Sequence, residues 1–319
     1  MRTSGTIIVN YRTPGLVVDC LRSLAPEVAA EPGVRVVVVD NLSPDDSLAV
    51  IGDAIRTNGW AGWCTLVAGE KNGGFSWGNN LAIRYLRDTA NPDYFHLLNP
   101  DTVVRPGAVS RLLDFLETHP EVGIAGSRLF YPDGRVQRSA FRFHGIRSEI
   151  DRGMKFGPVS KLLHRHIVAP PPRDEPHPTD WVSGASMMIR GEVFDRIGPL
   201  DEDYFLYYEE TDFCLRATRA GFAVWYVPDS CVVHLEGAST GIARPEKSLP
   251  AYWFASRRRY FRKNHSAAYE WLVNSGYCLS LASWRVRRRL QRKPDTDPKS
   301  ALADYLRYAL WPFGTKRSR

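Results

Sequence analysis

Apolar and polar residues alternate along the first 240 residues in a repeated strand and helix pattern. Apolar runs rich in β-branched residues predict buried strands at 6–10, 34–39, 63–67, 94–98 and 122–125. Helical spacing of apolar side chains, as in Val109, Leu112, Leu113 and Leu116, predicts helices between them, near 14–24, 43–55, 75–86 and 109–116. Strands that alternate with helices are typical of a parallel sheet covered on both faces. The pattern therefore predicts an α/β fold with a mostly parallel central sheet.

The second half of the chain is less regular. Residues 138–178 are basic, aromatic and proline-rich, which indicates a long surface loop or lid. Regular secondary structure is predicted again at 181–190, as a strand or strand pair. A helix is predicted over 209–220, and Gly221 ends it. Short strands are expected at 223–227 and 231–234, and helices at 251–263 and 269–292.

Polar residues follow three of the predicted strands. They are Asn10-Tyr11, Asp40-Asn41 and Asn99-Pro100-Asp101. Because the carboxyl ends of parallel strands share one edge, where ligands of open α/β sheets collect, we expect these side chains to converge. A carboxylate at the tip of a buried strand cannot be a core residue. Asp101 therefore indicates a site for a phosphate-bound metal ion.

The net charge of +7 conceals an asymmetry. After residue 243 the chain has 18 lysines and arginines against five acidic residues, a net charge of +13, whereas residues 1–243 carry −6. Such a tail, with interleaved aromatic and aliphatic residues, attracts an anionic membrane surface or a nucleic acid. Solvated helix faces are the simpler alternative. Residues 271–284 are apolar but interrupted by Asn274, Ser275 and Gly276, which favours an interfacial helix over a spanning one.

The cysteines and the N-terminus indicate a reducing compartment. Five scattered cysteines with no Cys-x-x-Cys favour neither a disulfide framework nor a zinc knuckle. The apolar stretch at 6–9 is shorter than a signal-peptide core. We expect a cytoplasmic protein without a spanning helix.

Several short motifs occur in a fixed order over residues 6–240. They are Val9-Asn10-Tyr11, Val39-Asp40-Asn41-x-Ser43, Asn72-x-Gly74-Phe75-x-x-Gly78-x-Asn80, Asn99-Pro100-Asp101, Gly184-Ala185, Asp201-Glu202-x-Tyr204-Phe205-x-Tyr207-x-Glu209-Glu210-x-Asp212 and His234-x-x-Gly237-x-Ser239. In this order they resemble the inverting glycosyltransferases of family 2, which have a GT-A (Rossmann-like) fold, and within them the rhamnosyltransferase-like branch that builds bacterial surface polysaccharides and cell walls.

The resemblance implies a catalytic domain over 1–243 and a basic helical C-terminal region over 244–319. Within the catalytic domain, 1–130 corresponds to the nucleotide-binding half, 138–178 to a variable loop and 179–243 to the acceptor and catalytic half.

The resemblance also implies a donor nucleotide site. Asn10 and Tyr11 would line the base pocket, and Asp40 would accept a hydrogen bond from the imide N–H of uracil or thymine. Asn72 and Gly74, with Gly73, would let the backbone approach the nucleotide closely. The alternatives are a helix-capping aspartate at Asp40, ordinary loop residues at 10–11 and a simple glycine turn.

Asn99 and Asp101 occupy the family's Asp-x-Asp positions. Asn99 can bind a ribose hydroxyl but brings no charge, so Asp101 would be the only carboxylate ligand of this motif for Mg²⁺ or Mn²⁺. His234 matches a second metal ligand of several members. Without that match, a histidine at a strand end is more often a surface or hydrogen-bonded residue.

Glu210 matches the general base, with one methylene more than the family's aspartate, and Glu209 is the alternative. Asp212 is expected to be a structural partner. Acidic residues that merely stabilise a helix N-terminus are the simpler interpretation. With one base and no carboxylate nucleophile, the reaction would be a single displacement with inversion.

The expected substrates are dTDP-L-rhamnose, or a UDP-hexose, and a hydroxyl of a glycan or lipid-linked glycan. Trp181, Gly184 and Ala185 would contact the acceptor, together with the 138–178 loop and residues near 204–208. The basic clusters 257–263 and 285–289 would dock the protein on the inner face of the cell membrane, while no nucleic-acid partner is expected and an oligomer is left open.

Two other functions stay open. A sugar-phosphate nucleotidyltransferase would show a basic glycine-rich loop after the first strand, which residues 10–14 do not provide. A non-catalytic nucleic-acid or membrane-binding protein would leave the polar strand ends unexplained.

Overall fold

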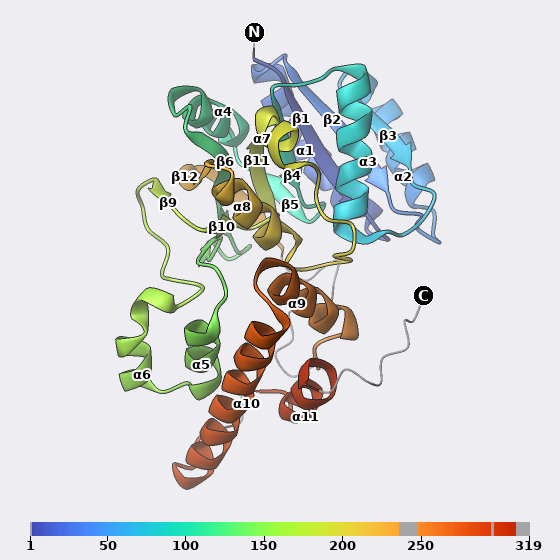
Figure 1. Cartoon of the computed structure of the whole chain (residues 1–319). Coiled ribbons are helices and arrows are strands. Elements are labelled where there is room, and N and C mark those ends of the chain that lie inside the picture. The colour runs from blue at the N-terminus through green and yellow to red at the C-terminus, as the bar shows by residue number, and fades with distance from the viewer. Residues whose placement is uncertain (1, 236–247, 295–296, 311–319) are drawn as a thin grey trace. The chain divides into compact units, whose positions relative to one another are not determined.

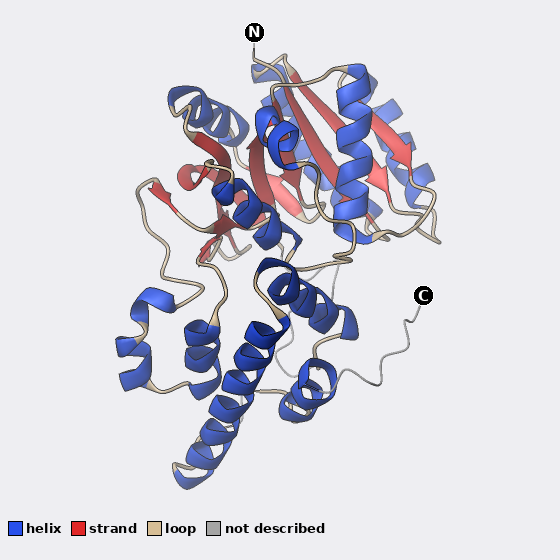
Figure 2. Cartoon of the chain, viewed as in Figure 1, coloured by secondary structure: helices blue, strands red, loops and turns tan. Residues whose placement is uncertain are grey.

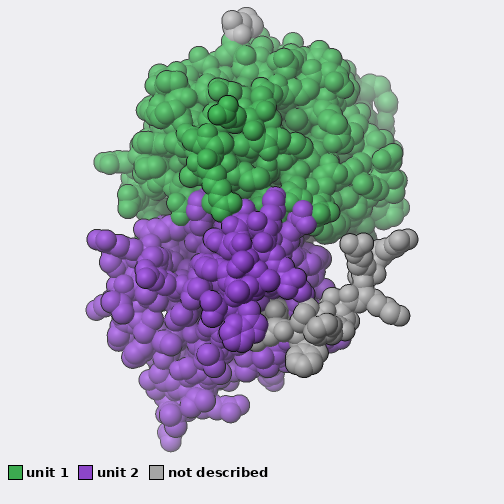
Figure 3. Space-filling model, viewed as in Figure 1, with its two compact units in different colours: residues 1–141, 171–205, 209–239 green, residues 142–170, 206–208, 240–319 purple. Residues whose placement is uncertain are grey.

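The protein forms two compact units, coloured green and purple in Figure 3. The structure, a computed structural model, describes residues 2–235, 248–294 and 297–310. Unit 1 consists of residues 1–141, 171–205 and 209–239, and unit 2 of residues 142–170, 206–208 and 240–319. Unit 1 holds the strands, whereas unit 2 is helical (Figure 2).

Unit 1 is built on a ten-stranded sheet (Figure 1). Its main path runs β3-β2-β1-β4-β11-β6-β12-β5, with β7 beside β6 and β9 beside β12. These strands are β1 (Ser4–Asn10), β2 (Val34–Asp40), β3 (Cys64–Ala68), β4 (Tyr94–Leu98), β5 (Thr102–Val104), β6 (Val122–Phe130), β7 (Val136–Gln137), β9 (His177–Pro178), β11 (Ser186–Arg190) and β12 (Ala223–His234). Two further short strands, β8 (Ala140–Phe141) and β10 (Trp181–Val182), form a separate pair.

The sheet is mostly parallel, as predicted. Strands β3, β2, β1 and β4 are parallel, and so are β6 and β12. Strand β11 runs antiparallel between β4 and β6, and β5 runs antiparallel to β12. Strand β2 has the sequence VRVVVVD, in which every residue except Arg35 is buried. Such a run of valines is expected for a strand covered on both faces.

Helices cover both faces of the sheet. Helices α1 (Pro14–Ala30), α2 (Ser47–Thr57) and α4 (Ala108–Thr118) share one hydrophobic core with alternate strand residues such as Ile8 and Val36. The other face is covered by α3 (Gly74–Thr89), α7 (Gly191–Ile197) and α8 (Glu209–Arg219), which lie in front of the sheet in Figure 1. On that face the Phe194 ring contacts Phe95 and Phe213, with centroids 5.2 and 5.1 Å away.

Three parts of unit 1 and unit 2 differ from the sequence predictions. The expected loop over 138–178 contains α5 (Ile146–Met154) and α6 (Gly157–Leu162), so the prediction of an irregular segment is wrong there. The reason is tertiary, because α5 packs along a helix more than 100 residues later in the chain. Strand β5 and helix α7 were not predicted, since three and seven residues are too few to show a period. Residues 223–234 form one strand with a register shift after Val227, where two strands were expected.

Unit 2 is a helical assembly around an aromatic core. Helices α9 (Ala251–Asn264) and α10 (Ala267–Leu290) confirm the two predicted C-terminal helices, and α11 (Ala301–Tyr305) and a π-helical segment at Leu306–Leu310 follow them. The core side chains are Phe254, Tyr277, Cys278, Leu281, Trp284 and Tyr305. No helix in the described ranges is both long and apolar enough to cross a bilayer.

Candidate active site

Predicted site residues of unit 1 meet at the carboxyl edge of its sheet. The register of β1 pairs Asn10 with Asp40 on one side and Ile8 with Leu98 on the other. On the far side of β4, the Asn99 N–H donates to the carbonyl oxygen of Ala185 at 3.1 Å. The ends of β2, β1 and β4 and the start of β11 therefore form one continuous edge, which is where ligands bind in open α/β sheets.

Asp40 is fully buried at this edge and is held by two neighbours. Its Oδ1 accepts from Asn10 Nδ2 at 2.6 Å and from the Ser43 hydroxyl at 2.7 Å, and its Oδ2 accepts from the Ser43 N–H at 2.9 Å. Helix α2 begins only at Ser47, so Asp40 does not cap it. A carboxylate has about four lone-pair sites. Asp40 Oδ2 can therefore accept one more donor.

The glycine loop after β3 lies beside this edge. Gly74 has a φ of +80°, and a Cβ there would lie 2.0 Å from the carbonyl oxygen of Phe205. Asn41 Nδ2 donates to the Gly74 carbonyl oxygen at 2.9 Å, which joins the loop to the end of β2. Asn72 Oδ1 accepts from the Gly74 N–H at 3.3 Å. Only glycine fits this close backbone approach.

Asn99, Asp101 and His234 form a second cluster. Asp101 Oδ1 lies 3.4 Å from His234 Nε2, and Asn99 Nδ2 lies 3.4 Å from the same nitrogen. The backbone brings them together, because β5 pairs Thr102 with His234 and the Leu235 N–H donates to the Asp101 carbonyl oxygen at 2.9 Å. Asp101 is 3% exposed, and a buried carboxylate is normally paired; its partner here is His234.

Gln137 sets the orientation of the His234 ring. Its Nε2 donates to the His234 carbonyl oxygen at 2.9 Å, which directs its Oε1 at His234 Nδ1, 3.1 Å away. Because Oε1 is an acceptor, this network assigns a ring proton to Nδ1. In the neutral ring, the Nε2 lone pair then faces Asp101 and the Asn99 amide. A lone pair and a carboxylate oxygen fit a shared divalent cation. The described ranges hold no cluster of three or more acidic, histidine or cysteine ligands, so such a cation would complete its shell with substrate and water.

Glu209 and Glu210 begin helix α8. Glu209 is buried and Glu210 is partly buried, and the Oε2 atom of each is inaccessible and has no hydrogen-bond partner. Burial raises the pKa of Glu210 to about 7, opposed by backbone N–H groups that include Gly184. Burial, assisted by the charge of Glu210, raises the pKa of Glu209 further above its usual value. A carboxylate whose pKa lies near neutrality is suited to general-base catalysis.

Gly184 joins this acidic pair to the sheet edge. A Cβ at Gly184 would lie 3.3 Å from the Phe75 ring and 3.9 Å from Glu210 Cβ. The Phe75 N–H donates to the Phe205 carbonyl oxygen at 2.9 Å. The glycine loop, the Gly184 turn and the start of α8 are therefore neighbours.

The remaining predicted residues have clear positions. Asp212 is buried and accepts from Arg216 Nε at 3.0 Å and the Tyr204 hydroxyl at 3.3 Å, so it has the structural role expected of it. The Trp181 ring stacks on Phe141 with centroids 4.2 Å apart, which occupies one ring face. Tyr11 is 39% exposed beyond the end of β1.

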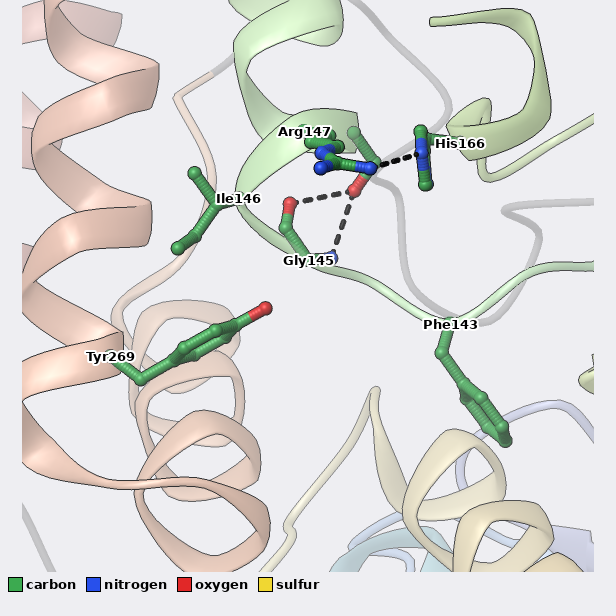
Figure 4. A pocket seen from close by; sticks show the side chains of 7 residues that line it. Phe143, Gly145, Ile146, Arg147, His166 and Tyr269 are labelled. Atoms are coloured by element: carbon green, nitrogen blue, oxygen red, sulfur yellow. Dashed lines mark hydrogen bonds between the residues drawn. The ribbon is translucent and has the colours of Figure 1, made fainter.

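Unit 2 contains a separate cavity of about 300 Å³ (Figure 4). It is lined by Phe143, Gly145, Ile146, Arg147, Ser148, His166 and Tyr269. Arg147 Nη1 donates to His166 Nε2 at 3.0 Å in its wall. None of the predicted site residues lines it.

Sequence reasoning missed two supporting residues. Ser43 holds Asp40 and stands in a motif that the sequence analysis quoted, so its spacing to Asp40 was a usable signal. Gln137 was not predicted at all. It reaches His234 through the pairing of β7 with β6, and no local pattern announces that contact.

Comparisons with known proteins agree with this architecture. The family model described as Glycosyl transferase family 2 matches residues 6–171, and that described as Glycosyl transferase family group 2 matches residues 94–307. An N-acetylglucosaminyl-diphospho-decaprenol L-rhamnosyltransferase of Mycobacterium tuberculosis is 28% identical over 217 residues, 66% of this chain and 65% of the relative. The dTDP-rhamnosyl transferase RfbF of Shigella flexneri is 24% identical over 74% of this chain and 73% of its own length. This chain thus covers slightly less than two thirds of the mycobacterial relative.

Solved structures show the same fold. The mannosyltransferase PcManGT from Pyrobaculum calidifontis, in complex with GDP-Man and Mn²⁺, superposes with a TM-score of 0.58 at 15% identity, over 92% of this chain and 76% of that chain. GalNAc-T7 with UDP, GalNAc and Mn²⁺ gives a TM-score of 0.57 at 14% identity, over 96% and 56%. These similarities confirm the predicted GT-A fold. Because each family model spans more than half of the residues and the sheet edge carries the family's motifs in order, the chain belongs to glycosyl transferase family 2.

Proposed function

We propose that the protein transfers a sugar from a nucleotide-sugar donor to a hydroxyl of a glycan or lipid-linked glycan, with inversion at the anomeric carbon. One observation carries the proposal: Glu210 lies beside the edge that carries the polar strand ends, its Oε2 is buried without a hydrogen-bond partner, and burial raises its pKa to about 7. In its ionised form Glu210 takes the proton of the acceptor hydroxyl while that oxygen bonds to the anomeric carbon. The bond from that carbon to the diphosphate breaks, and the nucleoside diphosphate leaves with its electron pair.

The donor site combines Asp40, Asn10 and the glycine loop. The remaining lone pair of Asp40 Oδ2 accepts the imide N–H of a uracil or thymine base, while Asn10 and Ser43 hold the carboxylate in place. Tyr11 borders the base. Asn72 and Gly74 keep the backbone close to the nucleotide, since any side chain at Gly74 would collide with Phe205.

The cluster of Asp101 and His234 fits Mg²⁺ or Mn²⁺, and the side-chain amide of Asn99 would bind a ribose hydroxyl. When bound, the ion would offset the charge that develops on the leaving diphosphate. Gln137 contributes by fixing the His234 tautomer and ring orientation. The Mn²⁺ named with PcManGT and GalNAc-T7 supports this donor set.

The named relatives favour dTDP-L-rhamnose over a UDP-hexose as donor and a lipid-linked glycan as acceptor. The acceptor would lie against Gly184 and Ala185, with Trp181 beside them. We place the protein in the cytoplasm, peripherally on the inner face of the cell membrane, as part of polysaccharide or cell-wall biosynthesis.

A thermal-shift panel of dTDP-, UDP- and GDP-sugars with Mg²⁺ or Mn²⁺ tests the donor site. A ligand at 100 times its Kd stabilises the native state by about 2.7 kcal/mol. We expect dTDP-L-rhamnose with a divalent ion to raise the Tm most and Asp40→Ala to abolish the shift. Asp53→Asn, a change at an exposed carboxylate, is the control. If no nucleotide sugar shifts the Tm, the proposed function is wrong.

A further inference from the structure

Helix α10 has one face in the core of unit 2 and an opposite face that no described residue covers. Val273, Tyr277, Leu281 and Trp284 point into the core. The opposite face carries large aliphatic side chains with high exposed fractions: Leu272 49%, Leu279 73%, Val286 61% and Leu290 81%. Isolated exposed leucines are ordinary, but several on one face indicate an interaction surface.

These four residues form a continuous stripe, which we call the α10 face. Their spacing of seven, seven and four residues keeps them on one side of the helix, over a length of about 27 Å. The positions between them on the same side are small: Ser275, Ala282 and Ser283. The helix extends beyond α5 and α11 at its C-terminal end (Figure 1), so the end of the stripe is accessible within unit 2.

The exposed charged side chains of the described residues at the C-terminal end of the α10 face are basic. Arg289, Arg292 and Lys293 are exposed at its C-terminal end, next to Leu290. The only acidic residue of α10, Glu270, is 3% exposed and pairs with Arg262 at 2.5 Å. No carboxylate on this helix therefore opposes an anionic partner.

Other basic residues of the C-terminal region form ion pairs and hydrogen bonds within unit 2. Arg257 is 1% exposed and pairs with Glu149 at 2.9 Å, so the 257–263 cluster does not act as a whole in docking. Arg285 donates to the carbonyl oxygens of Pro298 and Lys299, and Arg287 to those of Met154 and Lys155. The sequence analysis expected docking through the basic clusters 257–263 and 285–289. The structure leaves a smaller set of exposed basic residues, at the C-terminal end of the α10 face, for this role.

We propose that the α10 face, with Arg289, Arg292 and Lys293, is the docking surface for an anionic lipid membrane. Aliphatic side chains enter the headgroup boundary and the cations at the end of the helix meet lipid phosphates. A second copy of the chain fits less well, because a coiled-coil seam is normally flanked by charges of both signs and this helix offers only cations. The inference rests on the proposed function and deepens it, since it names the surface that brings the protein to a lipid-linked acceptor.

Co-sedimentation of the full chain with vesicles tests this surface. We expect binding to phosphatidylglycerol vesicles at low salt, little binding to phosphatidylcholine vesicles, and loss of binding at high salt. The triple variant Leu279→Ser, Val286→Ser and Leu290→Ser, and separately Arg289→Gln, Arg292→Gln and Lys293→Gln, should each lower the partition coefficient by about 100-fold. A double variant of exposed α2 residues, Leu48→Ser and Val50→Ser, should bind like the wild type.

Each contrary result has a definite meaning. Absence of wild-type binding at low salt, or unchanged binding by the aliphatic variant, overturns the proposal. A dimer that the aliphatic variant converts to monomer, with no vesicle binding, identifies a second copy as the partner instead. Donor binding is measured in parallel without vesicles by thermal shift. If the protein binds vesicles but no nucleotide sugar shifts its Tm, the proposed function is wrong and the docking surface is supported. If a nucleotide sugar shifts the Tm but the protein binds no vesicles, the docking surface is wrong and the proposed function is supported.

Discussion

Replacing Glu210 by glutamine should remove transfer and at the same time stabilise the protein at alkaline pH. Glutamine keeps the size of the side chain but cannot accept the acceptor's proton. We therefore expect transfer to fall by a factor of about 10² to 10⁴, with donor binding retained. For the wild type, transfer should rise with pH to a plateau above about 7, because burial raises the pKa of Glu210 to about 7 and only the ionised form is a base.

The expected stability change follows from the same pKa. An ordinary glutamate titrates near 4.5, and Glu210 titrates near 7 in the native state. Between these values the native state binds more protons than the unfolded state, so the free energy of unfolding falls as the pH rises through this window. The shift corresponds to about 3 kcal/mol at 1.36 kcal/mol per pH unit. The Glu210→Gln variant lacks this loss. Its free energy of unfolding, relative to that of the wild type, should therefore increase between pH 4 and pH 8.

Two measurements check the reasoning. Urea unfolding of wild type and Glu210→Gln at pH 4 and pH 8 gives the change in stability, and release of nucleoside diphosphate gives transfer. Glu209→Gln is the matched control. Burial and the charge of Glu210 also raise the pKa of Glu209, so by the same linkage Glu209→Gln should also raise the free energy of unfolding as the pH increases. It should, however, preserve most transfer, which separates the two carboxyl groups. Near-normal turnover in Glu210→Gln would exclude Glu210 as the base. A stability gain of this variant that does not grow with pH would show that the Glu210 carboxyl group is not desolvated.

Two further predictions concern the support of the site. Gln137→Leu should weaken Mn²⁺ binding by about 10- to 100-fold without unfolding the protein, because His234 loses the partner that orients its ring; calorimetric titration measures this, and an unchanged affinity would show that the Gln137 contact is dispensable. Gly74→Ala should lower the free energy of unfolding by more than Gly134→Ala in urea titrations. Both glycines have positive φ, which costs alanine about 1 to 2 kcal/mol, but only at Gly74 does the new methyl group also meet a carbonyl oxygen. Equal losses would contradict the close approach to Phe205.

The strands were predictable where burial on both faces dictated their sequence. The Tyr94–Leu98 strand has the predicted bounds, and Val34–Asp40 extends the prediction by one residue. The 138–178 segment was not predictable, because α5 depends on a buried ion pair between Glu149 and Arg257 that joins residues 108 positions apart. Periodicity reports only what a residue's near neighbours in sequence impose.

The candidate site likewise has a part that the sequence predicts and a part that it does not. The convergence of Asn10, Asp40 and Asn99 followed from the rule that parallel strands end at one edge. The contact between Gly184 and Glu210 needed knowledge of where α8 starts relative to β11, which no spacing encodes. Gln137 lay outside every motif, since its role depends on a two-residue strand.

The local environments of Glu209 and Glu210 favour Glu210 over Glu209 as the proposed base. Both are desolvated, and two adjacent buried carboxylates cannot both ionise near neutrality at low cost. Glu210 is the better stabilised anion, because backbone N–H groups of Gly184, Glu210 and Thr211 lower its pKa against the effect of burial. Glu209 has only its own backbone N–H, and the charge of Glu210 raises its pKa further. When the pair shares one proton, that proton is therefore favoured on Glu209, and a neutral Glu209 lowers the cost of ionising Glu210. A neutral Glu209 would thus support Glu210 as the proposed base, and the Oε2 of Glu210, which has no hydrogen-bond partner, would accept the proton of an acceptor hydroxyl.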